Sequence, residues 1–180
     1  MKKLALLFLV CITACKTPEA RKPVHQSSSK TMRSSIERTK ALLIAEQELF
    51  QSFIAKDSTN RYIATEKGAW YTYHTLVETA SDFPETDDLV TFTYDIRTIN
   101  NDTIYTQSSI GEQVYKVDKQ KLFPGLRNAI KLLKVNESAT FLFPSPQAFG
   151  YRGDANKIGP NVPIQSRVTI LAIEKNKNQN

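Results

Sequence analysis

The chain has 180 residues, a length that favours one domain with attached segments over two domains. Its composition, 41% hydrophobic and 23% charged residues, is that of a globular protein and excludes a disordered or collagen-like chain. The formal net charge of +6 is modest, and no stretch interleaves lysine and arginine with aromatic residues. The pattern therefore argues against nucleic-acid binding.

The N-terminus has the pattern of a bacterial lipoprotein signal peptide. Lys2 and Lys3 precede an uncharged apolar run, Leu4–Ile12, that is too short to span a bilayer permanently. The run ends in Ile12-Thr13-Ala14-Cys15, which resembles the bacterial lipobox. We therefore predict a signal peptide over residues 1–14, acylation of Cys15, and a lipid-anchored, periplasm-facing protein of the cell envelope. The alternative is an ordinary secretory leader in which Cys15 is incidental.

The next two segments are predicted to be a tether and a helix. Residues 15–34 are rich in Ser, Lys, Thr and Pro without an apolar period, which predicts a flexible tether. Ser34 and Glu37 match a capping box, and an amphipathic helix is predicted over 35–57. Its apolar side must cover either the downstream domain or a second copy of the chain. The second arrangement would give a homodimer. The apolar positions are Ile36, Leu42, Leu43, Leu49, Phe50 and Phe53.

In the remainder of the chain, apolar and polar residues alternate with a period of two. We predict a domain over 61–175, followed by a tail over 176–180. One later segment looks helical, Gly125 to Leu133. Short strands with one helix predict an antiparallel α+β domain, the helix packing across the concave face of the sheet. In the last strand Ile164, Val168, Ile170 and Ala172 are expected on one face. The predicted strands are Trp70–Glu78, Val90–Ile96, Thr103–Gln107, Gln113–Val117, Ser138–Phe143 and Ile164–Ala172.

Several kinds of chemistry have no support in the sequence. The two histidines, His25 and His74, fall in the tether and in a predicted strand, so neither a metal site nor a Ser–His–acid arrangement is expected. The six glycines form no phosphate-binding loop, and no cofactor is predicted. Arg152-Gly153-Asp154 is interpreted as a turn in a glycine-containing loop.

Four short motifs, taken together in their order along the chain, are the most informative feature of the sequence. They are Asp88-Leu89-Val90-Thr91-Phe92-Thr93-Tyr94, Phe123-Pro124-Gly125-Leu126, Pro146-Gln147-Ala148-Phe149-Gly150 and Ile158-Gly159-Pro160-Asn161. Over roughly residues 68 to 174 the chain resembles the FKBP-type peptidyl-prolyl cis-trans isomerase family. With its lipobox and N-terminal helix it also looks like the gliding-motility-associated isomerase lipoproteins.

The resemblance implies a twisted antiparallel half-barrel wrapped around the Gly125–Leu133 helix. It also implies a prolyl isomerase that needs no cofactor or metal, acts on proline-containing polypeptides, and assists folding of exported or envelope proteins. The amide of Phe123 would donate to a substrate carbonyl. The implied substrate-binding residues are Tyr94, Tyr105, Leu122, Phe123, Leu126, Phe149, Ile158 and Ser166, and the candidate catalytic residues are Tyr94, Thr106, Phe123 and Phe149.

The sequence departs from the family pattern inside this site. Thr106 replaces an acidic residue, Leu126 a tryptophan, Phe149 a tyrosine, and Ser166 and Gln113 stand where the family has aromatic residues. We therefore expect the fold to persist and catalysis to be weak. Two alternatives follow: a binding module with little turnover, and a structural lipoprotein of an envelope assembly.

Overall fold

A computed structural model describes residues 28–78 and 82–176. The predicted signal peptide, Cys15, most of the predicted tether and almost all of the predicted tail lie outside these residues. By its contacts the chain divides into two units, Met1–Glu37 and Arg38–Asn180. Within the described residues, no helix combines the length and the apolarity that crossing a membrane requires.

The predicted N-terminal helix is present as α2, Ser28–Lys56. It begins within the segment predicted as tether, and Ser34 lies inside the helix, so the capping-box prediction at Ser34 is wrong. The physical reason is that each residue added to an existing helix gains a hydrogen bond, so a polar Ser/Lys/Thr segment can extend a helix that the following residues stabilise.

From Arg38 onward, α2 presents one stripe to the rest of its unit. Glu46 and Phe50 are buried on this stripe, four residues apart, as one helix face requires. Phe50 forms a small core with Ile99 and Leu142. Phe53, Ile54, Tyr62 and Trp70 pack against that core. This part of the helix therefore covers its own domain, one of the two arrangements expected from the sequence.

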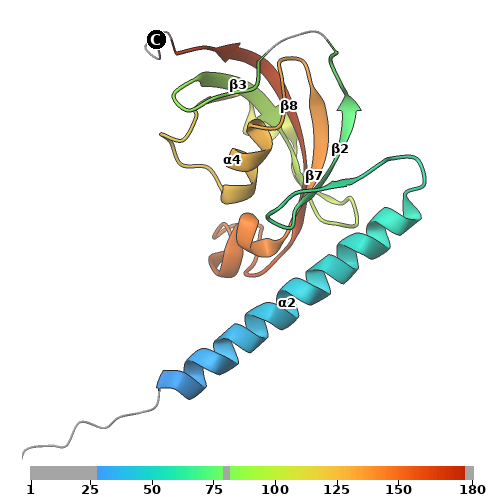
Figure 1. Cartoon of the computed structure of the whole chain (residues 1–180), viewed down its shortest axis with the longest axis vertical. Helices are drawn as coiled ribbons and strands as arrows, with labels where there is room; N and C mark the ends of the chain where they lie inside the picture. Colours follow the sequence, from blue (N-terminus) through green and yellow to red (C-terminus); the bar gives the residue numbers. More distant parts are fainter. Residues whose placement is uncertain (1–27, 79–81, 177–180) are drawn as a thin grey trace, which may run out of the picture. The chain divides into compact units, whose positions relative to one another are not determined.

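The described strands form one antiparallel sheet with the order β1-β2-β7-β8-β3-β6, and β4 pairs with β5 and β8 (Figure 1). The sheet is open. The strands are β1 Ile63–Ala64, β2 Trp70–Thr75, β3 Leu89–Tyr94, β4 Ile96–Arg97, β5 Thr103–Tyr105, β6 Gln113–Lys116, β7 Ser138–Phe143 and β8 Ile164–Glu174. Two 3₁₀ turns, η2 Ser145–Gln147 and η3 Gly150–Arg152, lie in the segment between β7 and β8.

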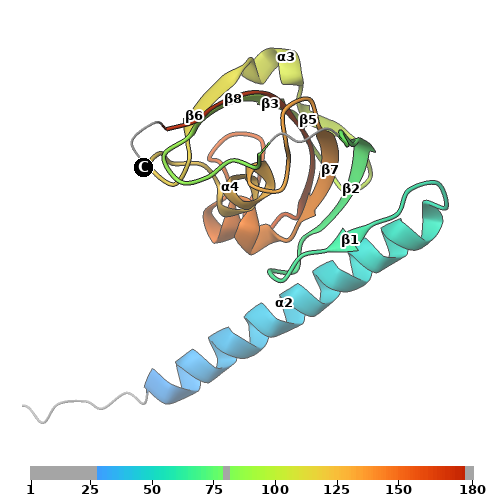
Figure 2. The ribbon, with the colours of Figure 1, turned by 45° about the horizontal axis from the view of Figure 1, so that its top comes forward.

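The sheet curves around one short helix, α4, Pro124–Ile130 (Figure 2). Pro124 occupies the first turn of the helix. The backbone N–H that proline lacks would have no partner within the helix at this position. Leu126, Ala129 and Ile130 are buried against the apolar face of the sheet. The predicted α+β class, with a helix against the concave face, is confirmed.

Two local predictions are wrong. Thr91 pairs with Ala172 but Phe92 pairs with Ile170, so β8 contains a bulge. The extra residue shifts the alternation: Ala172 is exposed, and Ile173 packs against the core instead. A second helix after residue 61, α3 over Gln107–Ile110, was not predicted because its single turn is too short to show a period.

Candidate functional site

Phe123 is the centre of an aromatic cluster at the N-terminus of α4. Its ring centroid lies 6.4 Å from that of Tyr94, 5.2 Å from Phe149 and 5.6 Å from Phe143. These rings come from the end of β3, from the N-cap of α4, from the segment after η2 and from β7. Phe123, Tyr94 and Phe149 are each half-buried, so the cluster presents aromatic surface to solvent rather than closing into the core.

Two hydrogen-bond donors at this cluster are unused by the described part of the chain. No described group accepts from the amide of Phe123 or from the hydroxyl of Tyr94. Burial raises the pKa of the Tyr94 hydroxyl, so it stays protonated at neutral pH and can donate. An apolar ligand with a carbonyl group would find both a wall and a donor here.

Tyr105 is tied to the segment between β7 and β8 by Asp154, a residue that the sequence analysis placed only in a turn. The Tyr105 hydroxyl donates to Asp154 Oδ2. Asp154 Oδ1 accepts from the amides of Ile158, at 2.8 Å, and Asn156, at 2.9 Å. The Lys157 ammonium lies 4.9 Å from the centre of the Tyr105 ring.

These contacts set the ionisation of the pair. Partial desolvation opposes ionisation of Asp154, but hydrogen bonds from Tyr105 and the two amides outweigh it and lower the pKa of the carboxyl. The hydrogen bond to Asp154, with desolvation, raises the pKa of Tyr105. A carboxylate therefore lies next to Tyr105, although position 106 lacks one. Only its place in the motif-bearing loop could have suggested Asp154 from sequence.

The other predicted site residues range from exposed to fully buried. Thr106 is exposed and caps α3, because its hydroxyl accepts from the amide of Ser109 at 3.1 Å. Ser166 is fully buried, and its hydroxyl donates to the carbonyl of Asp95 at 2.6 Å. Leu126 and Ile158 belong to the core, and Leu122 is half-buried against it. Their predicted contacts with substrate stay predictions.

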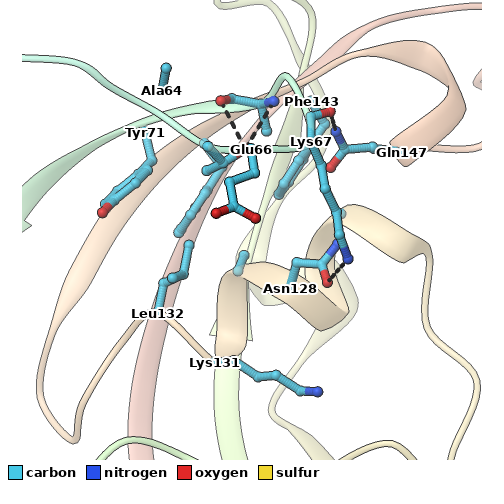
Figure 3. A pocket seen from close by; sticks show the side chains of 14 residues that line it. Ala64, Glu66, Lys67, Tyr71, Asn128, Lys131, Leu132, Phe143 and Gln147 are labelled. Carbon is cyan, nitrogen blue, oxygen red and sulfur yellow. Dashed lines mark hydrogen bonds between the residues drawn. The ribbon is translucent and has the colours of Figure 1, made fainter.

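A separate cavity of about 420 Å³ lies between α4, β7 and the turn that joins β1 to β2 (Figure 3). None of the predicted site residues lines it. Its lining combines apolar side chains, among them Tyr71, Leu132 and Phe143, with polar ones such as Lys67 and Gln147. Because Phe143 lines this cavity and also packs against Phe123, the cavity and the aromatic cluster share one ring. In the described part of the chain, no three His, Cys, Asp or Glu side chains gather as a metal site would require.

Comparison with known proteins agrees with this architecture. The model of the FKBP-type peptidyl-prolyl cis-trans isomerase family matches residues 80–171. A probable FKBP-type peptidyl-prolyl cis-trans isomerase FkpA from Neisseria meningitidis is 27% identical over 139 residues, which are 77% of this chain and 50% of the relative. The chain thus spans about half the length of that curated relative.

Two solved structures share the fold. A peptidyl-prolyl cis-trans isomerase from Pseudomonas syringae pv. tomato superposes with a TM-score of 0.57 at 21% identity, covering 76% of this chain and 96% of that one. FkpA from Escherichia coli superposes with a TM-score of 0.60 at 16% identity, covering 97% and 82%. The match over residues 80–171, on a sheet curved around α4, shows that this chain belongs to the FKBP-type peptidyl-prolyl cis-trans isomerase family.

Proposed function

We propose that the chain catalyses cis–trans isomerisation of peptidyl-prolyl bonds. The observation that carries the proposal is the half-buried aromatic cluster around Phe123 in a chain of this family. Its Phe123 amide and Tyr94 hydroxyl are donors that no described group uses.

This geometry suits the reaction. Rotation about the prolyl bond has a barrier near 20 kcal/mol because twisting the bond removes amide resonance. An apolar wall favours the twisted amide, which is less polar than the planar one, and a donor can hold the neighbouring carbonyl. No nucleophile is needed, so the chemistry rests on shape and desolvation.

Turnover is proposed to be slow. Phe149 has no hydroxyl, and the Thr106 hydroxyl bonds the amide of Ser109 rather than a pocket group. A tenfold lower rate needs only about 1.4 kcal/mol of lost transition-state stabilisation, so either departure is large enough to matter.

The test is a protease-free isomerisation assay on an X–Pro peptide with the wild type and the double variant Thr106→Asp with Phe149→Tyr. The expected result is low but real turnover by the wild type and higher turnover by the double variant. High wild-type turnover that the substitutions leave unchanged would show that other residues carry the reaction.

A binding module is the second candidate, favoured by the same departures at Thr106 and Phe149. It predicts saturable binding of the peptide with no acceleration of cis–trans exchange by either protein. A peptide titration run beside the isomerisation assay therefore separates the two functions. A structural role in an envelope assembly, including one linked to gliding motility as the resemblance suggests, predicts stable partners in a pull-down from envelope fractions.

We also propose that Cys15 carries a lipid anchor that holds the protein at the cell envelope. The support is Ile12-Thr13-Ala14-Cys15 with a small residue before the cysteine. One acyl chain anchors only marginally, whereas several anchor firmly. Intact-mass analysis of the membrane fraction is expected to find an acylated chain beginning at Cys15. An unmodified Cys15, or another first residue, would refute the anchor.

Self-association through α2 is a further proposal. Phe50 is engaged within its own domain, but Ile44 is 60% exposed on the same helix. A second helix could cover it. Light scattering on residues 16–180 is expected to give a dimer, whereas Ile44→Lys should give a monomer. A monomeric wild type would end this proposal.

A further inference from the structure

Helix α2 holds the segment that leads to Phe149, which we define as residues 144–149. Glu46 of α2 is only 4% exposed, and its Oε2 accepts from the amide of Ser145 at 2.8 Å. Ser145 is the first residue of η2, which ends at Gln147. Phe149 follows two residues later and packs against Phe123. A residue far from the aromatic cluster in sequence thus fixes one end of the segment.

The next residue of α2 fixes the same segment by a second route. Gln47 donates to the carbonyl of Gly68 at 2.7 Å and accepts from the indole N–H of Trp70 at 3.0 Å. These bonds hold the turn between β1 and β2. In that turn the carbonyl of Lys67 accepts from the Gln147 side chain (Figure 3). Two consecutive helix residues therefore restrain the 144–149 segment at Ser145 directly and at Gln147 through the turn.

The Glu46 contact is poorly built for stability. Within the described residues, Glu46 Oε1 and Ser145 Oγ are buried without a hydrogen-bond partner. A buried carboxylate with one of its oxygens unpaired costs folding free energy that a well-packed apolar side chain would not. An unsatisfied buried group in a folded protein calls for an explanation, and the contact with Ser145 offers a positional one.

We infer that Glu46 is a positioning residue for Phe149 and, through it, for the aromatic cluster, with Gln47 in support. The inference rests on the proposed isomerase function. Phe149 lies against Phe123 through one ring contact, so a small displacement of the 144–149 segment changes the wall that a prolyl ring would meet. The helix that follows the N-terminal segment thereby sets the geometry of the site.

The experiment uses the full chain with Glu46→Leu, Glu46→Gln and the control Glu48→Leu, since Glu48 is exposed on the same helix. Glu46→Leu is expected to lower kcat/KM about tenfold, because misplaced groups lose rate steeply with distance. Glu46→Gln keeps an oxygen that can accept from the Ser145 amide, so its kcat/KM should lie within about threefold of the wild-type value. Glu48→Leu should leave it unchanged.

Amide hydrogen exchange gives a readout that does not depend on turnover. Glu46→Leu is expected to speed exchange at Ala148 and its neighbours within 144–149 while β8 keeps its protection. Equal exchange and equal kcat/KM in Glu46→Leu and Glu48→Leu would overturn the inference. Loss of protection in β8 as well would assign Glu46 to global stability and also overturn it.

Two further outcomes remain informative. Should Glu46→Leu fail to fold, Gln47→Ala must produce the same local rise in exchange within 144–149, and its absence would refute the inference. Should the wild type show no turnover, the proposed isomerase function fails, while the exchange measurement still decides whether α2 positions Phe149.

Discussion

The two ends of β7 are each held by a buried glutamate, and the two differ in how completely that glutamate is used. Before the strand, Glu137 is 1% exposed and accepts from the amides of Val77, at 3.1 Å, and Lys134, at 2.8 Å, with one carboxylate oxygen each. After the strand, Glu46 accepts from the amide of Ser145 alone among the groups of residues 28–78 and 82–176.

We interpret the difference as one between a structural contact and a contact that positions the site. Glu137 closes a turn and satisfies its own charge with two N–H groups, as a stable buried carboxylate requires. Glu46 reaches the far end of β7 from α2, across 99 positions in the sequence, and one of its oxygens has no partner in the described part of the chain. We therefore expect substitutions at the start of β7 to affect the whole fold and substitutions at its end to affect the site.

The largest expected effect is that of Glu137→Ala. It leaves two N–H groups without their acceptor and should lower the free energy of unfolding by about 3 kcal/mol. Glu46→Ala, which strands one N–H and removes a poorly satisfied charge, should lower it by about 1 kcal/mol. Urea unfolding of the two variants measures both. Equal losses would remove the distinction between the ends of the strand.

The second prediction concerns Gly125, which faces the end of β7. A Cβ here would lie 2.5 Å from Phe143 Cδ1 and 2.9 Å from the carbonyl oxygen of Gln147. Gly125→Ala should therefore push Phe143 or α4 aside and cost about 2 kcal/mol in unfolding free energy, as overpacking does. Arg127→Ala, exposed on the same helix, serves as the control. A neutral Gly125→Ala would show that this contact yields easily.

A smaller effect is expected from Asp154→Asn, which removes the charge next to Tyr105. Since the hydrogen bond to Asp154 is the main cause of the raised pKa of Tyr105, that tyrosine should ionise at lower pH in the variant. Ultraviolet titration detects the change, and Tyr105→Phe identifies the signal. The exposed Asp102→Asn is the control. An unchanged titration would mean that the pair does not form.

The same carboxyl gives the smallest effect, a pH dependence of stability. Because the pKa of Asp154 is lowered in the folded state, its contribution to stability is present above the unfolded pKa of about 3.9. It is lost as pH falls through the folded pKa. Wild type should therefore lose more stability than Asp154→Asn between neutral pH and the acid range. Parallel loss would contradict this.

The sequence predicted the elements whose signal is local. Val90 and Phe92 alternate in β3 as expected, and the apolar spacing after Gly125 marked α4. It could not locate the bulge that exposes Ala172, because a bulge shifts the phase without changing the residue types. The prediction from sequence placed the start of α2 too late because capping residues such as Ser34 also occur inside helices.

The site divides in the same way. Family resemblance placed Tyr94, Phe123 and Phe149 together, and the structure brings these three rings into contact. Asp154 and Glu46 were missed because their partners, Tyr105 and Ser145, are distant in sequence and no periodic pattern encodes such pairs. The catalytic roles of Tyr94, Thr106, Phe123 and Phe149 stay predictions.

The most direct test of the central claim is the rate of cis–trans exchange in an X–Pro peptide, measured by NMR exchange spectroscopy with the full chain and with Phe123→Ala. If the Phe123 cluster is the active site, the wild type accelerates exchange, and Phe123→Ala, checked for an intact sheet by its amide spectrum, loses at least about tenfold of that acceleration. Equal acceleration by both proteins would place the reaction elsewhere and contradict the account.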